Sequence, residues 1–184
     1  MRWFWIDRFL EFEHRRRAVA VKNISLAEDC MEEHLPGFPV FQNTLVIEGI
    51  AQTGGLLAGE ASGFLERVVL AKVAKAVFHF QAVPGDTLTY AATLEDIKPD
   101  GAICVATSHC GSRLHAEVEL VFAHLDDRFA GVDLFKPSDF LVMLRLLGMY
   151  TVGRKPDGSL LDIPAHLLEA EHALDALPIG AETT

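Results

Sequence analysis

Hydrophobic and polar residues alternate in several runs within the first 125 positions of the chain, and alternation with a period of two predicts strands. Residues 17–25 alternate most regularly, with Ala18 on one face and Val19 on the other. Residues 5–13 form a second such run, and the polar residues 13–16 between the two runs predict a turn. Further strands, joined by short turns, are predicted at residues 67–80, 87–97, 102–109 and 113–124.

Residues 44–61 have a different pattern, apolar on nearly all sides, which predicts a buried helix. Asn43 or Thr44 is expected to cap its first turn. Gly54 and Gly55 each cost about 1 kcal/mol relative to alanine in a helix interior, which indicates the close approach of a neighbouring backbone. The predicted fold class is therefore α+β, with an antiparallel sheet of five or six strands wrapped around this helix.

The pattern changes after residue 125. Pro137 opens an amphipathic run over residues 140–149, residues 153–158 form a polar turn, and residues 164–177 suggest another helix. We expect one domain over residues 1–125 and a C-terminal helical extension over residues 126–184, packed on the same domain. The extension is expected to cover a sheet face or an oligomer contact.

Composition narrows the possible partners and the compartment. The formal net charge of −10 argues against a nucleic-acid or anionic-membrane partner, because both require a concentrated basic surface. Cys30, Cys104 and Cys110 form no CxxC pair, so we expect neither a disulfide framework nor a zinc knuckle. No apolar run is long enough for a signal peptide or a membrane span, which predicts a soluble cytoplasmic protein.

Two residues in the segment 34–52 are candidates for acid/base chemistry. His34 lies in a predicted loop, residues 26–42, that is rich in proline, glycine and acids, and Glu48 is a carboxylate inside the apolar helix. Histidine titrates near neutrality and can take a proton, whereas a carboxyl group in apolar surroundings has its pKa raised and can give one. The start of the helix offers backbone N–H groups that could polarise a carbonyl.

Each signal also has a structural interpretation. A histidine in a loop is more often structural than catalytic, and Glu48 could instead pair with an arginine. Gln52, one helical turn after Glu48, is interpreted as a satisfied polar partner. The remaining histidines match no ligand spacing, so we expect no metal site and no cofactor.

The segment His34-Leu35-Pro36-Gly37-Phe38-Pro39, followed by Glu48 and then Ala51-Gln52, resembles the signature of the 3-hydroxyacyl-acyl-carrier-protein dehydratases of fatty-acid synthesis. The family has a His-Phe-Pro-Gly-x-Pro-x-x-Pro-Gly loop leading into a central helix that bears Glu or Asp. The resemblance extends over residues 5–124. At the family's second Pro-Gly, this chain has Gln42-Asn43; asparagine tolerates positive φ and caps helices, so the backbone could be kept.

The resemblance implies a hot-dog fold and a homodimer or trimer of dimers, in which His34 of one subunit meets Glu48 of the other. It implies a lyase that dehydrates a 3-hydroxyacyl thioester to the trans-2-enoyl thioester, with acyl carrier protein presenting the acyl chain on phosphopantetheine. His34 would take the C2 proton, and Glu48 would protonate the departing hydroxyl. Asn43 and Thr44, at the helix start, would bind the thioester oxygen.

Two other functions stay open at this point. A hot-dog enzyme with the same residues could hydrolyse acyl thioesters instead of dehydrating them. A non-catalytic subunit that binds an acyl group or partners an active dehydratase is the other alternative, motivated by Gln42-Asn43 and by the added tail.

Overall fold

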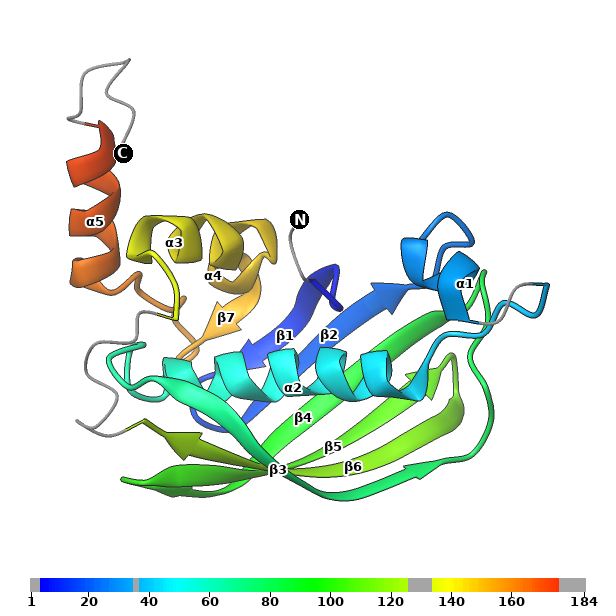
Figure 1. The fold of residues 1–184 in the computed structure, drawn as a ribbon. Helices are drawn as coiled ribbons and strands as arrows, with labels where there is room; N and C mark the ends of the chain where they lie inside the picture. Colours follow the sequence, from blue (N-terminus) through cyan, green and yellow to red (C-terminus); the bar gives the residue numbers. More distant parts are fainter. Residues whose placement is uncertain (1–3, 35–36, 126–133, 176–184) are drawn as a thin grey trace.

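A computed structural model describes residues 4–34, 37–125 and 134–175, and in this part of the chain one curled sheet holds a long helix (Figure 1). The order of the strands across the sheet is β3-β6-β5-β4-β2-β1-β7. Their bounds are β1 (Arg8–Glu13), β2 (Arg17–Asn23), β3 (Val68–Phe78), β4 (Thr87–Lys98), β5 (Gly101–Cys110), β6 (Arg113–His124) and β7 (Gly153–Arg154).

The predicted fold class is confirmed: six strands pair antiparallel around a central helix, and further helices follow them in the chain. The prediction did not include β7. This strand of two residues comes from the C-terminal extension and pairs parallel with β1, through Phe12 with Gly153 and Glu13 with Arg154. A strand of two residues has no period that a sequence pattern can show.

Helix α2 (Asn43–Glu60) lies in the curl of the sheet, as Figure 1 shows. Val46, Ile50 and Leu57 are fully buried against the sheet. The sheet contributes alternate residues to the same core, among them Leu88 and Tyr90 of β4. Burying side chains of this size contributes roughly 1.5–3 kcal/mol each, so packing explains why an apolar helix forms here.

Two predictions about α2 are wrong. Neither Asn43 nor Thr44 caps the helix, because Gln42 is the N-cap and makes no capping hydrogen bond with its side chain. Gly54 and Gly55 also make room for neighbouring side chains rather than for a neighbouring backbone. A Cβ atom at Gly54 would lie 2.8 Å from Cys104 Sγ, and one at Gly55 would lie 3.3 Å from the ring of Phe122.

The loop predicted over residues 26–42 contains a short helix, α1 (Asp29–His34). Ser25 makes two hydrogen bonds just before it: its Oγ accepts from the Ala27 N–H, and its N–H donates to Glu28 Oε1. A serine followed three residues later by glutamate is the capping-box signature of a helix start. The prolines and glycine that suggested irregular structure all come after this helix.

The C-terminal extension holds α3 (Pro137–Leu146), α4 (Met149–Val152) and α5 (Ala165–Asp175). Leu141 and Leu144 of α3 are fully buried in the same core cluster as the sheet and α2. The Phe9 N–H of β1 donates to the Leu147 carbonyl over 2.8 Å. The boundary at residue 125 stays a prediction, since residues 126–133 lie outside the described part of the chain.

Within the described ranges, no helix combines the length and the apolar character needed to cross a membrane.

Candidate functional site

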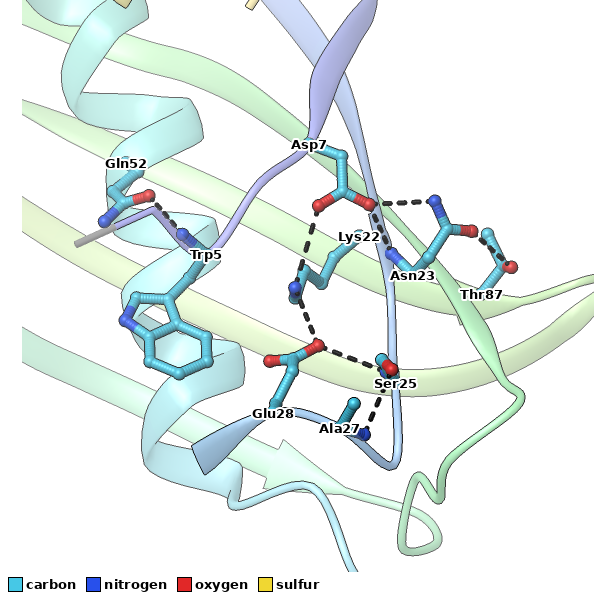
Figure 2. Close-up of polar contacts among 9 residues, drawn as sticks. All are labelled: Trp5, Asp7, Lys22, Asn23, Ser25, Ala27, Glu28, Gln52 and Thr87. Carbon is cyan, nitrogen blue, oxygen red and sulfur yellow. Dashed lines mark hydrogen bonds and ion pairs between the residues drawn. The ribbon is translucent and has the colours of Figure 1, made fainter. Parts of the chain in front are cut away.

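Glu48 lies in the second turn of α2, half-buried, on the face of the helix that lines a cavity. Gln52, one turn later, donates from Nε2 to Glu48 Oε1 over 3.0 Å. The Gln52 Oε1 accepts the backbone N–H of Trp5 over 2.9 Å (Figure 2). Since the amide oxygen accepts from Trp5, the amide nitrogen must point to Glu48, and the orientation of the carboxylate is fixed.

Gly49 allows the segment before β1 to approach α2 closely. A Cβ atom at this position would lie 2.6 Å from the Trp5 carbonyl oxygen and 2.6 Å from the ring of Tyr90. Any side chain would therefore push Trp5 away from the helix, and with it the N–H group that holds Gln52. The glycine next to Glu48 is thus required for the position of its hydrogen-bonded neighbour.

The first turn of α2 supplies the predicted binding positions Asn43 and Thr44. The Phe41 N–H donates to the Ala82 carbonyl over 2.8 Å, which fixes the segment that enters the helix. The first N–H groups of a helix have no partner within it, so Asn43 and Thr44 present donors at the positive end of the helix dipole. The buried Asn43 Oδ1 has no hydrogen-bond partner within the described structure. The positive φ expected for Asn43 is absent, since this residue is helical.

His34 is the last residue of α1, and its side chain lies outside the described part of the structure. Residues 35 and 36 of the motif also lie outside it. The predicted pairing of His34 with Glu48 therefore stays a prediction.

A buried lysine ties the start of α1 to the segment that carries Trp5. The side chain of Lys22 is 9% exposed, and its Nζ lies 2.9 Å from Glu28 and 3.6 Å from Asp7 (Figure 2). The same Nζ lies 5.8 Å from the centroid of the Trp5 ring, within the range of a cation–π contact. Trp5 thus contacts Gln52, the hydrogen-bond partner of Glu48, on one side. On the other side it contacts Lys22, whose ion pair with Glu28 holds the start of α1.

Burial raises the pKa of the Tyr90 hydroxyl well above its usual range, and the charges of Asp7 and Glu28 add to the effect. Tyr90 is fully buried, and its ring lies under Gly49. Tyr90 is therefore a neutral side chain that packs beneath Gly49, the residue next to Glu48.

A cavity of about 550 Å³ runs along α2 beside Glu48. This volume is typical of sites for small molecules and cofactors, and apolar side chains predominate in the lining. One face of α2 provides Glu48, Ala51, Gln52, Gly55, Leu56 and Gly59. The arrangement places one carboxylate, oriented by an amide, at an apolar cavity, which suits proton transfer to an apolar substrate.

Sequence reasoning missed Trp5 and Lys22. Their spacing to Gln52 and Glu28 has no local pattern: Trp5 and Gln52 are 47 positions apart. The alternation in β2 places Lys22 correctly on a strand, but the acids that neutralise it come from two other segments. The capping box at Ser25 and Glu28 was a readable signal for α1, the helix that ends at His34.

Comparison with known proteins identifies the same family through a family model and through similar sequences. A family model described as a FabA-like domain matches residues 3–116. The chain is 40% identical over 121 residues to the 3-hydroxyacyl-[acyl-carrier-protein] dehydratase FabZ of Desulforamulus reducens, covering 64% of this chain and 84% of the relative. It is 38% identical over 124 residues to the protein of the same name from Helicobacter pylori strain G27, covering 62% of this chain and 77% of the relative.

Solved structures support the fold at low sequence identity. The dehydratase heterocomplex ApeI:P from Xenorhabdus doucetiae aligns with a TM-score of 0.57 at 11% identity, over 68% of this chain and 86% of that chain. A conserved protein from Pseudomonas aeruginosa aligns with a TM-score of 0.52 at 16% identity, over 64% of this chain and 87% of that chain.

Proposed function

The chain belongs to the FabA-like family of 3-hydroxyacyl-[acyl-carrier-protein] dehydratases, enzymes of fatty-acid synthesis, and we propose that His34 and Glu48 carry out its reaction. The observation that supports this most directly is Glu48, held by Gln52 in the lining of an apolar cavity. The substrate is a 3-hydroxyacyl group on acyl carrier protein. We place the enzyme in the cytoplasm, where the relatives' substrate carrier is expected.

In the proposed reaction, His34 takes a proton from C2 of the 3-hydroxyacyl thioester. The electron pair of the broken C2–H bond forms the double bond between C2 and C3. Glu48 gives its proton to the 3-hydroxyl group, and the C3–O bond breaks to release water. The proton on His34 then returns to Glu48 through solvent, so the enzyme is regenerated.

The start of α2 is proposed to bind the thioester carbonyl. As the C2 proton leaves, negative charge develops on the thioester oxygen, and the N–H groups of Asn43 and Thr44 lie at the positive end of the helix dipole. These donors would stabilise the charge in the transition state. The Gln42-Asn43 pair does not obstruct this role at the level of the backbone, because Gln42 has an extended conformation and Asn43 a helical one.

We propose that two chains share each site through β3. This strand lies at one edge of the sheet, and most of its side chains are exposed, including Leu70, Val73 and Val77. An open, apolar edge strand of eleven residues favours pairing with another chain. A homodimer formed at this edge, or a trimer of such dimers, would allow His34 of one subunit to meet Glu48 of its partner.

Hydration of crotonyl-pantetheine, the reverse reaction, tests the assignment. His34→Ala and Glu48→Gln should each abolish most of the activity, whereas His172→Ala and Glu95→Gln, both at exposed positions, should not change it. Full activity in both site variants would overturn the assignment. Release of free thiol would indicate a thioesterase instead, and acyl binding without turnover would indicate a non-catalytic subunit.

Mixed dimers test the shared site. When the His34→Ala and Glu48→Gln chains are co-expressed with different tags and purified through both, each mixed dimer contains one site with both residues intact. We expect activity to return to about half of the wild-type value per dimer. If each chain held its own pair, every site would carry one defect and no activity would return.

A further inference from the structure

The C-terminal extension supplies one wall of the cavity beside Glu48. The FabA-like match ends at residue 116, so α3 and α5 lie beyond the part of the chain that the family model describes. The extension nevertheless contributes Phe135, Phe140, Met143, Leu147, His166 and Leu167 to the lining. This wall is therefore a property of this chain rather than of the matched segment.

The cavity is long because α2 lines it over three turns. The lining residues of α2 recur at intervals of three and one, from Glu48 to Gly59, which places all of them on one face of the helix. At 1.5 Å per residue, the eleven steps between Glu48 and Gly59 correspond to about 16 Å along the helix axis. Since a carbon–carbon bond is about 1.5 Å long, at least eleven bonds in a row are needed to span this distance.

Aromatic side chains close the end of the cavity farthest from Glu48. A Cβ atom at Gly59 would lie 3.0 Å from the ring of Phe64, so Phe64 marks the end of the α2 lining. Phe140 of α3 packs edge-on against Phe64, with ring centroids 5.0 Å apart, and Phe135 stacks on Phe140 at 5.0 Å. Two of the three rings at this end thus come from the extension.

The wall is fixed in place by the core. Leu141 and Leu144, on the face of α3 next to the lining residues, are fully buried, and Arg145 of α3 pairs with Glu171 of α5. Leu147 is hydrogen-bonded to β1 through its carbonyl. A wall anchored in this way can exclude a chain that is too long, whereas a loose segment would move aside.

We propose that α3 and α5 form the distal wall of the acyl-binding cavity and set the length of acyl chain that the enzyme prefers, with a preference for chains of about twelve carbons over four-carbon chains. The proposal rests on the proposed function, because Glu48 at the other end identifies the occupant as the acyl chain of the thioester. The lining of the cavity is predominantly apolar, which fits an alkyl chain.

Narrowing the cavity from α3 tests the proposal in the full-length protein. Met143→Trp adds bulk at a lining position, and Val142→Trp is the matched control, since Val142 is 41% exposed and does not line the cavity. The readout is the ratio of kcat/KM for 2-dodecenoyl-pantetheine to that for crotonyl-pantetheine. We expect Met143→Trp to lower this ratio at least tenfold and Val142→Trp to leave it within twofold of the wild-type value.

Phe140→Ala provides a second variant, which opens the far end and should shift the preferred chain length upward. The proposal is wrong if the chain-length ratio is unchanged in both Met143→Trp and Phe140→Ala while crotonyl-pantetheine is still hydrated. Absence of hydration in the wild type would instead count against the proposed function. In that case calorimetric binding of dodecanoyl-pantetheine decides: weaker binding by Met143→Trp alone supports the wall, and equal binding by all variants overturns it.

Discussion

The two glutamates of α2 are in opposite environments, although both lie in the same apolar helix. Glu60, in the last turn, is 9% exposed, and both of its carboxylate oxygens lie 2.8 Å from His14 Nδ1. Glu48, about 18 Å away along the helix axis, is half-buried, lines the cavity, and accepts its hydrogen bond from the neutral amide of Gln52.

This difference separates a structural carboxylate from a chemical one. Glu60 faces a histidine that can carry the compensating charge, and the pair joins the turn between β1 and β2 to the end of α2. Glu48 is oriented by its partner without being neutralised by it. A carboxylate that must exchange a proton with a substrate needs this second arrangement, since a tight ion pair would hold it ionised.

The largest effect is expected on kcat, from a substitution at Glu48. Glu48→Gln keeps the shape of the side chain and an oxygen for Gln52, but removes the proton donor, so kcat should fall by about 10²–10⁴-fold. The free energy of unfolding should stay within about 0.5 kcal/mol of the wild-type value. Crotonyl-pantetheine hydration and urea denaturation measure the two quantities.

Glu60→Gln is the matched control, because it is the same chemical change on the same helix. It should lower the free energy of unfolding by about 1–2 kcal/mol while kcat stays within a few-fold of wild type. A loss of kcat equal to that of Glu48→Gln would show that the two carboxylates do not have separate roles.

The next largest effect is expected on the free energy of unfolding, from loss of the His14–Glu60 pair. His14→Ala leaves the buried Glu60 carboxylate without its partner, which should cost about 1–3 kcal/mol of unfolding free energy. The midpoint of urea denaturation, followed by tryptophan fluorescence, should fall with an unchanged slope. Arg16→Ala is a suitable control, since the Arg16 pair with Glu13 is exposed and should contribute less than about 1 kcal/mol. Equal losses in the two variants would contradict a structural role for the His14–Glu60 pair.

A smaller effect is expected at Gln52, which we assign as a positioning residue. Gln52→Leu removes the amide that orients Glu48, and a misplaced acid should reduce kcat about tenfold, with a smaller change in KM. Gln81→Leu, at an exposed position, is the control. A purely structural role would lower the free energy of unfolding without this selective loss of kcat.

The smallest effect is a partial rescue at the structural glutamate. His14→Gln can still donate a neutral hydrogen bond to Glu60, so it should cost about 0.5–1 kcal/mol, less than His14→Ala. Thermal unfolding of the two variants in parallel measures the difference. If His14→Gln destabilised the protein as much as His14→Ala, a hydrogen bond to Glu60 would not account for the stability that His14 contributes.

The elements of the sheet could be predicted because strand and helix periods are local. β6 covers residues 113–124 as predicted, and the turn at Pro84-Gly85-Asp86 is closed by Asp86, whose carboxylate accepts the Val83 N–H. The cap of α2 could not be predicted from side-chain preference, because the N-cap is Gln42, which has an extended backbone and makes no capping hydrogen bond with its side chain. β7 was missed because two residues acquire strand geometry only by lying beside β1.

The sequence by itself determined the candidate acid, Glu48, the buried helix that carries it, and the six long strands along the chain. These follow from hydrophobic periods of 2 and 3.6 residues, which any short window of the chain contains. Only the tertiary structure decided which carboxylate is paired and which faces the cavity, since His14 and Glu60 are 46 positions apart. It also placed α3 and α5 around the same cavity as α2, because contacts between distant segments depend on the path of the whole chain.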